Sequence, residues 1–150
     1  PLSDTAALVA WCSQEEADRP VFAVNLAGKE LWQDTWQQKY VWPYFDFAEN
    51  GSRFAYESVE TNGSMSVVGS TMDLDEIVGQ MVGVYDTETG KLVLVKDASP
   101  HITAGQNVAL SPDGSRFAVL RDGAIEIYDL PPVSTPAPAQ AKAPEKKREK

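Results

Sequence analysis

An aspartate, a serine and a histidine lie close together in the segment Asp97–His101, DASPH. His101 is the only histidine in the chain, and these three side-chain types form the catalytic triad of many hydrolases. A triad depends on its three-dimensional arrangement, and adjacency within one loop gives no geometric support for one. A lone histidine in a loop is more often solvated or hydrogen-bonded. We therefore predict no catalytic residues and retain His101 as a candidate binding residue.

Three acidic side chains, Asp73, Asp75 and Glu76, have the chemistry of a Ca²⁺ site. The glycine and the spaced ligands of an EF-hand loop are missing, however. Ser70 with Asp73 instead resembles a helix-capping pair, which predicts a short helix over Met72–Val78 with these carboxylates at its start. No phosphate-binding loop or dinucleotide fingerprint is present. The sequence therefore predicts no metal and no cofactor, and Asp73 and Asp75 remain candidate binding residues.

Three aromatic side chains, Trp36, Tyr40 and Trp42, crowd the segment Gln33–Pro43. Aromatic rings anchor many binding interfaces because they bury a large apolar area. The alternative is that some of them, Trp42 first, pack inside the fold. Trp36 lies between a threonine and a glutamine and is expected to be exposed. We therefore select Trp36 and Tyr40 as candidate binding residues for a peptide or a sugar.

The charge of the chain is unevenly distributed. The net charge at pH 7 is −9, of which residues 1–130 carry −12 and residues 131–150 carry +3. A body this acidic repels a phosphate backbone, so we predict that it does not bind nucleic acid. No apolar run approaches the roughly 20 residues that span a bilayer, which predicts no transmembrane segment in this portion. The single Cys12 excludes an internal disulfide and a cysteine-based zinc site, and it leaves the compartment open.

Regular elements must position these candidate residues, and an internal repeat indicates which elements they are. The pentapeptide GSRFA occurs at 51–55 and again at 114–118, an offset of 63 residues. VGVYD at 82–86 and IEIYD at 125–129 are offset by only 43 residues. The earlier copy therefore carries about 20 additional residues, and the underlying period of 43 falls within the 40–45 residues of a four-stranded propeller blade.

Apolar alternation between glycine-containing turns predicts short antiparallel strands. The expected strands form a partial, a middle and a final unit: Ala6–Trp11, Val21–Asn25 and Lys29–Trp32; Tyr44–Phe47, Arg53–Ser58, Met81–Tyr85 and Leu92–Lys96; Asn107–Leu110, Arg116–Leu120 and Ala124–Tyr128. The middle unit contains an insertion, VETNGSMSVVGSTMDLDEIVGQ, in which Asn62-Gly63 indicates a hairpin.

Side-chain alternation indicates which strands are central. Residues 117–120 are apolar on both faces, which is typical of an inner strand buried on both sides. In the following strand, Ile125 and Ile127 alternate with Glu126 and Tyr128. This alternation predicts that one face of the last strand is wetter than the other.

The last unit, SPDGSRFAVLRDGAIEIYD at 111–129, resembles the repeat of bacterial β-propellers of the broad WD40-like class. GKELW at 28–32, echoed by GKLVL at 90–94, is similar to the repeat of quinoprotein-type propellers. The resemblance covers residues 5–130 and implies an all-β fold of four-stranded antiparallel blades. The Gly-His dipeptide and terminal Trp-Asp of eukaryotic WD40 blades are absent, so the hydrogen-bonded tetrad of that family is not carried over.

The resemblance divides the chain into blades over 1–130 and a tail. The blades are a partial blade at 5–32, a blade at 44–96 interrupted by the insertion at 59–80, and a final blade at 107–130. A closed ring takes about 4 to 8 blades, so we expect the C-terminal fragment of a larger propeller, with upstream blades of the same chain missing. Residues 131–150, rich in proline, alanine and lysine, are expected to be disordered because they lack large apolar side chains.

Connections between antiparallel strands alternate between the two ends of a sheet. The short turns, with the exception of Arg121–Gly123, are expected at one end. The long connections are expected at the other: Cys12–Pro20, Gln33–Pro43, Val59–Gln80 and Asp97–Gln106. Loops displayed by a rigid scaffold often carry binding residues. We therefore expect a non-catalytic β-propeller scaffold or binding module that presents its loop-rich end to a protein or peptide.

The resemblance leaves two alternatives open. Blades of this kind also frame enzymes such as quinoprotein-like dehydrogenases, although no cofactor ligand is recognisable in this segment. Similar bacterial propellers serve as envelope-associated sensor domains, which would place the chain in the periplasm or elsewhere outside the cytoplasm.

Overall fold

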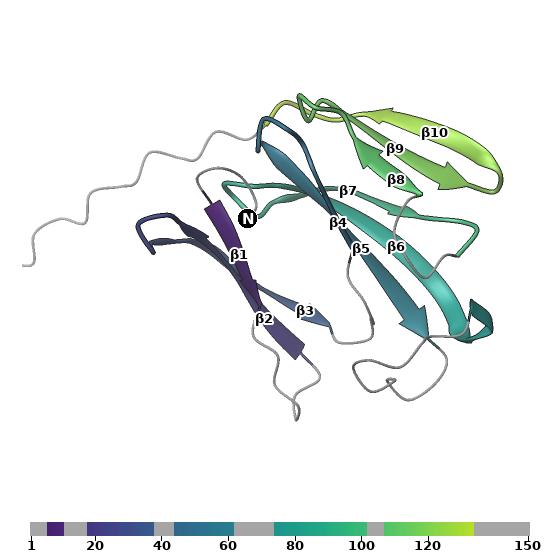
Figure 1. Cartoon of the computed structure of the whole chain (residues 1–150), viewed down its shortest axis with the longest axis horizontal. Coiled ribbons are helices and arrows are strands. Elements are labelled where there is room, and N and C mark those ends of the chain that lie inside the picture. Colours follow the sequence, from purple (N-terminus) through teal and green to yellow (C-terminus); the bar gives the residue numbers. More distant parts are fainter. Residues whose placement is uncertain (1–5, 11–17, 38–43, 62–73, 102–106, 134–150) are drawn as a thin grey trace, which may run out of the picture.

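Three antiparallel sheets follow one another along the chain in the computed structural model, and the middle sheet lies between the other two (Figure 1). The structure describes residues 6–10, 18–37, 44–61, 74–101 and 107–133. Within these ranges, every regular element except one short 3₁₀ turn is a strand. The predicted all-β class and the predicted antiparallel pairing are therefore confirmed.

The first sheet has the order β1 (Ala6–Ala10), β2 (Asp18–Asn25), β3 (Glu30–Gln37). The hairpin of β2 and β3 is longer than predicted, since its ladder continues to the pair of Asp18 with Gln37. Trp36 consequently belongs to a strand, where it pairs with Arg19, and not to the loop in which the sequence placed it. Continued backbone pairing explains the difference, because it satisfies groups that a loop would leave to water.

The middle sheet has the order β4 (Tyr44–Phe47), β5 (Arg53–Thr61), β6 (Ile77–Asp86), β7 (Leu92–Asp97). The bounds of β4 are those predicted. The ladder of β5 with β6 extends to the pair of Thr61 with Ile77, so both ends of the proposed insertion are strand.

The helix predicted over Met72–Val78 is wrong at its C-terminal end. Among the described residues of this range, Leu74–Glu76 form the 3₁₀ turn η1, and residues 77 and 78 belong to β6. The reason is tertiary, because Ile77 is buried and pairs with β5. Residues 72 and 73, and the hairpin signal at Asn62-Gly63, lie outside the described residues.

The third sheet has the order β8 (Val108–Leu110), β9 (Arg116–Arg121), β10 (Ala124–Asp129). Strands β9 and β10 meet at a two-residue turn, where Asp122 has a φ of 50° and Gly123 has a φ of 81°. Positive φ at both positions is the type I′ geometry, which matches the twist of a hairpin. This turn is the one that the Arg121-Asp122-Gly123 segment predicted.

Neighbouring sheets pack through unlike faces: the face that a sheet turns toward the following sheet meets the opposite kind of face on that sheet. One face of the middle sheet, with Phe54, packs against Ala6 and Ala23 of the first sheet. Its opposite face packs against the third sheet, in a buried cluster whose members are Ala55, Val82, Val84, Ala98, Phe117 and Val119. Phe54 and Phe117 are both fully buried, as the repeat predicts. The inner strand β5 is buried on both faces from Arg53 through Ala55, and β9 is half-buried on its second face.

The wetter face of β10 is the apolar one. Ile125 and Ile127 are 72% and 66% exposed, whereas Glu126 and Tyr128 are half-buried. Tyr128 shares the face of Phe117, with which it pairs, and that face is turned toward the middle sheet. Residue polarity alone would have assigned the two faces the other way round, because it takes no account of which face meets a neighbouring sheet.

Candidate functional site

One end of the sheets is closed by tight turns that hydrogen-bond to each other. The Thr87 amide, in the β6–β7 turn, donates to the Ser52 carbonyl of the β4–β5 turn at 3.0 Å. The Asn50 side chain of the same β4–β5 turn donates to the Asp113 carbonyl of the β8–β9 turn at 2.8 Å. The first bond joins two turns of the middle sheet, and the second fixes the middle and third sheets to one another at this end.

A buried arginine strengthens the junction of these two sheets. Arg53 and Asp86 are each 1% exposed at the side chain, and Arg53 Nε lies 2.9 Å from Asp86 Oδ1. Arg53 Nη1 donates to the Gly114 carbonyl at 2.7 Å, and Nη2 donates to the Pro131 carbonyl. A buried ion pair is tolerated when its remaining hydrogen-bonding groups are satisfied. Because these hydrogen bonds link the middle and third sheets, we assign a structural role to Arg53 and Asp86.

Trp32 makes the corresponding link between the first and middle sheets. Its Nε1 donates a hydrogen bond to the Thr87 carbonyl at 2.8 Å. Its ring stacks on the Phe54 ring, with 6.2 Å between the ring centroids and an interplanar angle of 6°. Gly90 has a φ of 65°, and a Cβ built there would come within 2.5 Å of the Trp32 ring. Glycine is therefore required at position 90 both by backbone conformation and by space.

The opposite end of the sheets carries the long connections. β5 ends at Thr61 and β6 begins beside it at Ile77, while β7 ends at Asp97 beside Met81. The connecting segments 11–17, 38–43, 62–73 and 102–106 lie outside the described residues. The strand ends that flank them are at this one end, as expected from antiparallel pairing. This loop-bearing end is the candidate functional site.

The structure locates three of the five candidate residues chosen from sequence. Asp75 is exposed in η1, and His101 is half-buried beyond the end of β7, so both belong to connections at the loop-bearing end. Trp36 lies near the C-terminal end of β3, which also reaches this end. Tyr40 and Asp73 are outside the described residues.

Sequence reasoning passed over Glu57, a buried acid on β5. Glu57 is 1% exposed, and neither of its carboxylate oxygens accepts a hydrogen bond of normal geometry from the described residues. Burial raises the pKa of Glu57 from 4.5 to about 7, and the nearby Asn107 side chain offsets part of this rise. The signal was a glutamate on a strand expected to be an inner one, because buried positions rarely carry a charged residue unless it is paired.

Glu57 belongs to a small polar group between the middle and third sheets. Asn107, which precedes β8, is 4% exposed and donates from Nδ2 to Gln80 Oε1 at 3.2 Å. The Asn107 side chain also acts on Glu57, since it lowers the pKa of that carboxyl group. We therefore treat this group as an internal network that titrates near neutral pH.

The described ranges contain no group of three or more His, Cys, Asp or Glu side chains placed to hold a metal ion. Asp75 and Glu76 are exposed side chains of the η1 turn. Among the helices in the described part of the chain, none has the length and apolarity needed to cross a membrane.

Comparison with protein-family models gives no match, and no curated protein matches the chain at a significant level.

Proposed function

We propose that the chain contributes blades to a non-catalytic β-propeller scaffold, which presents its loop-bearing end to a protein or peptide. The observation that carries this proposal is the contrast between the two ends of the sheets. One end is fixed by turns that bond to each other and by the buried pair of Arg53 with Asp86. Long connections leave the other end, and rigid scaffolds commonly carry their binding residues on such loops.

The sheet arrangement supports the assignment of blades. The middle sheet is a four-stranded meander in which sequence neighbours are also neighbours in space. One four-stranded and two three-stranded antiparallel sheets, packed one on the next and related by a sequence repeat of 43 residues, support an assignment to propeller blades. A closed ring takes about 4 to 8 blades, so further sheets would complete it.

The chemistry at the loop-bearing end favours a polypeptide partner. The body of the chain carries a net charge of −12 over residues 1–130, which repels nucleic acid and attracts basic side chains. Trp36 and Tyr40 would supply aromatic anchors, and Asp73, Asp75 and His101 would supply polar contacts around them.

Selection of peptides from a displayed library on the immobilised chain tests this function. The affinity of a selected peptide is then measured by calorimetry with the wild type and with Trp36→Ala and Tyr40→Ala. At least one of these variants is expected to bind about 10-fold more weakly or worse, the effect of truncating a moderate anchor. Glu88→Ala, at an exposed position of the tight-turn end, is the matched control and should bind as the wild type does.

Two results would contradict the proposal. The first is a selected peptide whose binding depends on Glu88 and not on Trp36 or Tyr40. The second is a library that yields no peptide whose binding depends on residues of the loop-bearing end.

A further inference from the structure

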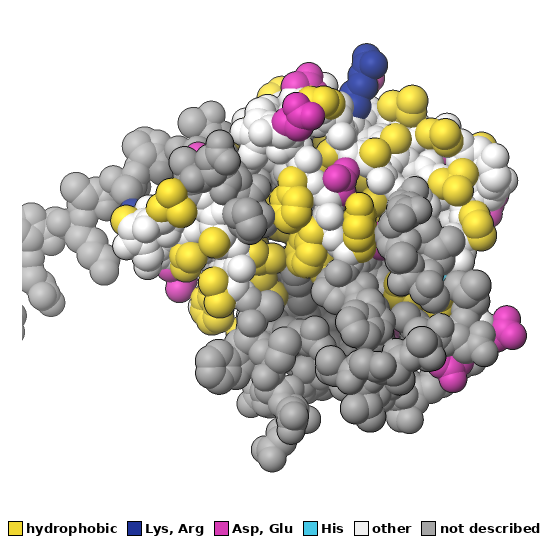
Figure 2. Space-filling model, in the orientation of Figure 1, with side chains coloured by type: hydrophobic (Ala, Val, Ile, Leu, Met, Phe, Trp, Pro, Cys, Tyr) yellow, Lys and Arg dark blue, Asp and Glu magenta, His cyan; other side chains and the backbone are white. Residues whose placement is uncertain are grey.

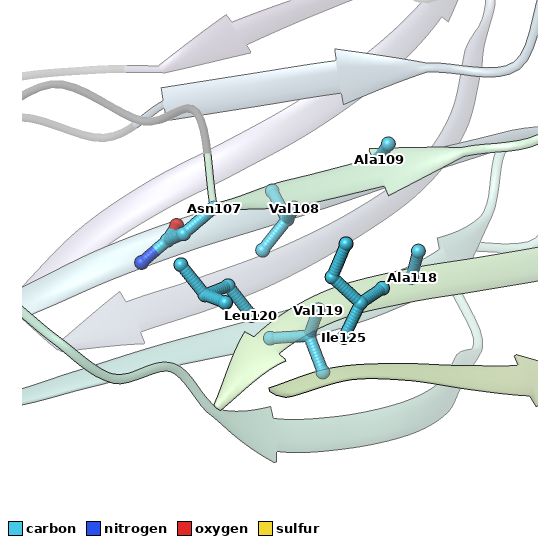
Figure 3. A pocket seen from close by; sticks show the side chains of 7 residues that line it. All are labelled: Asn107, Val108, Ala109, Ala118, Val119, Leu120 and Ile125. Carbon is cyan, nitrogen blue, oxygen red and sulfur yellow. The ribbon is translucent and has the colours of Figure 1, made fainter. Parts of the chain in front are cut away.

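The outer face of the third sheet exposes apolar side chains that no described part of the chain covers. Ile125 and Ile127 of β10 are 72% and 66% exposed. Figure 2 shows hydrophobic side chains gathered over the β8–β10 sheet, at the upper right. A hollow of about 210 Å³ opens on this sheet, and its lining comes from all three strands (Figure 3). Ala109 and Ala118 are small residues of this lining.

The middle sheet has an equivalent face, and in the middle sheet this face is covered by the third sheet. Ala118 pairs with Ile127 in the third sheet, as Ala55 pairs with Val84 in the middle sheet. Ala55 and Val84 are 1% and 0% exposed. They are covered by the face of the third sheet that carries Phe117, which belongs to the same buried cluster. The exposed face is therefore equivalent to one that, in this same molecule, is the surface of a sheet–sheet interface.

The polar contact of that interface is also repeated. Arg116 Nε lies 3.0 Å from Asp129 Oδ1, but the two side chains are 66% and 85% exposed. The equivalent pair, Arg53 with Asp86, is 1% exposed on both sides, and Arg53 donates further to carbonyls of the neighbouring sheet. Among the described hydrogen bonds of the Arg116 side chain, Asp129 is the only partner. Its guanidinium group can therefore donate further hydrogen bonds to a sheet that packs on the exposed face of the β8–β10 sheet.

The first sheet presents the complementary face. The described side chains on its outer side include Ala7, Val9, Phe22 and Val24, since Val9 pairs with Phe22 and Ala7 with Val24. Val9 is 48% exposed. These positions match Phe54 and its neighbours in the middle sheet, on the side that packs against a preceding sheet. Among the described residues, one sheet face of each kind is therefore left uncovered, at opposite ends of the stack of three sheets.

We propose that the exposed face of the β8–β10 sheet binds the outer face of the β1–β3 sheet of a second copy of this chain, head to tail. Both existing sheet–sheet interfaces join unlike faces, so the contact between copies is heterologous, with Ile125 and Ile127 packing against Val9 and Phe22. Heterologous contacts either close into a ring or grow into a filament. This inference rests on the proposed blade architecture, in which two copies of the three described sheets would supply six sheets, a number within the range of closed propellers.

Analytical ultracentrifugation of the whole chain tests this inference. The measurement runs from about 1 to 100 µM, where a micromolar complex forms, at about 150 mM salt to screen the acidic bodies. A concentration-dependent dimer is expected. Replacing both isoleucines, Ile125→Lys with Ile127→Lys, should weaken the dimer at least about 30-fold, the effect of losing a hot-spot contact. Leu26→Lys, at a 77% exposed apolar position in the β2–β3 turn, is the matched control and should leave the dimer intact.

A mixing experiment establishes which faces meet. Val9→Lys alone should also abolish the dimer, and mixing it with the double isoleucine variant should restore a 1:1 complex, because each variant retains one intact face. A wild type that stays monomeric throughout the range overturns the inference. So does a Val9→Lys variant that dimerises as the wild type does, since the isoleucine faces would then pair with each other. Neither result bears on peptide binding at the loop-bearing end.

Discussion

At the scale of single residues, Arg53 and Glu57 are both buried, but their surroundings treat the charge differently. Arg53 is compensated by Asp86 and by backbone carbonyls. Glu57 is not compensated to the same degree, and its pKa rises to about 7. The first residue fixes two sheets to each other, and the second makes the same junction sensitive to pH.

Glu57 predicts a fall in stability through the neutral range. The folded-state pKa of about 7 lies above the ordinary 4.5, so the contribution of this group is fully present below pH 4.5 and is lost as the pH rises through 7. The loss approaches about 3 kcal/mol at pH 8, at 1.36 kcal/mol for each pKa unit. Glu57→Gln should remove this slope and be more stable than the wild type at pH 8.

Urea unfolding at pH 5, 6, 7 and 8 measures the difference between Glu57→Gln and the wild type. The exposed Glu88→Gln is the control and should follow the wild type at every pH. Asp113 does not interfere, because hydrogen bonds from Ser111 and Ser115 lower its pKa to about 2, and its contribution is lost only in acid. A difference that does not change between pH 5 and pH 8 would contradict the assignment.

Arg53 predicts a large effect from a single truncation. Arg53→Ala leaves Asp86 buried without its partner, which should lower the free energy of unfolding by about 3–5 kcal/mol. Arg116→Ala removes the equivalent arginine from an exposed pair and should cost about 1 kcal/mol or less. Denaturant unfolding of both variants gives the comparison. Equal losses in the two variants would show that burial does not distinguish the pairs.

At the scale of elements, the inner strands β5 and β9 carry the contacts between sheets. Phe54 joins the middle sheet to the first, and Phe117 joins the third sheet to the middle one. The pentapeptide repeat alone predicts that both phenylalanines lie on inner strands. Strand ends were less predictable, because the extra pairs of β3 and β6 depend on a neighbouring strand being present to continue the ladder.

Truncating either phenylalanine tests these interfaces. Phe54→Ala and Phe117→Ala should each cost about 3–5 kcal/mol in the free energy of unfolding, since both side chains are fully buried and the cavity cannot refill. Ile127→Ala removes apolar atoms from a 66% exposed side chain and should stay within about 0.5 kcal/mol of the wild type when the chain is monomeric. A cost below about 1 kcal/mol at position 54 or 117 would refute the packing.

At the scale of the whole molecule, the middle sheet is the only one of the three described sheets that is covered on both faces. Amide exchange at β5 and β6 should therefore require global unfolding and be the slowest in the chain. Amides of β3 and of β10, which border their sheets, should exchange earlier through local opening. Hydrogen exchange with mass-spectrometric detection measures this order. Protection in β10 that equals that of β5 in monomeric protein would contradict it.

The sequence by itself determined the all-β class and the antiparallel pairing of the described strands, because apolar alternation and turn glycines are local signals. It also identified the tight turns, since Gly51, Gly90 and Gly114 hold positive φ at the predicted positions. Only the tertiary structure decided which face of each strand is covered. Ile125 and Ile127 are exposed although apolar, and Glu57 is buried although charged, because burial follows from where the neighbouring sheet lies. The same dependence placed Ile77 in a strand and turned Trp36 from a loop residue into part of β3.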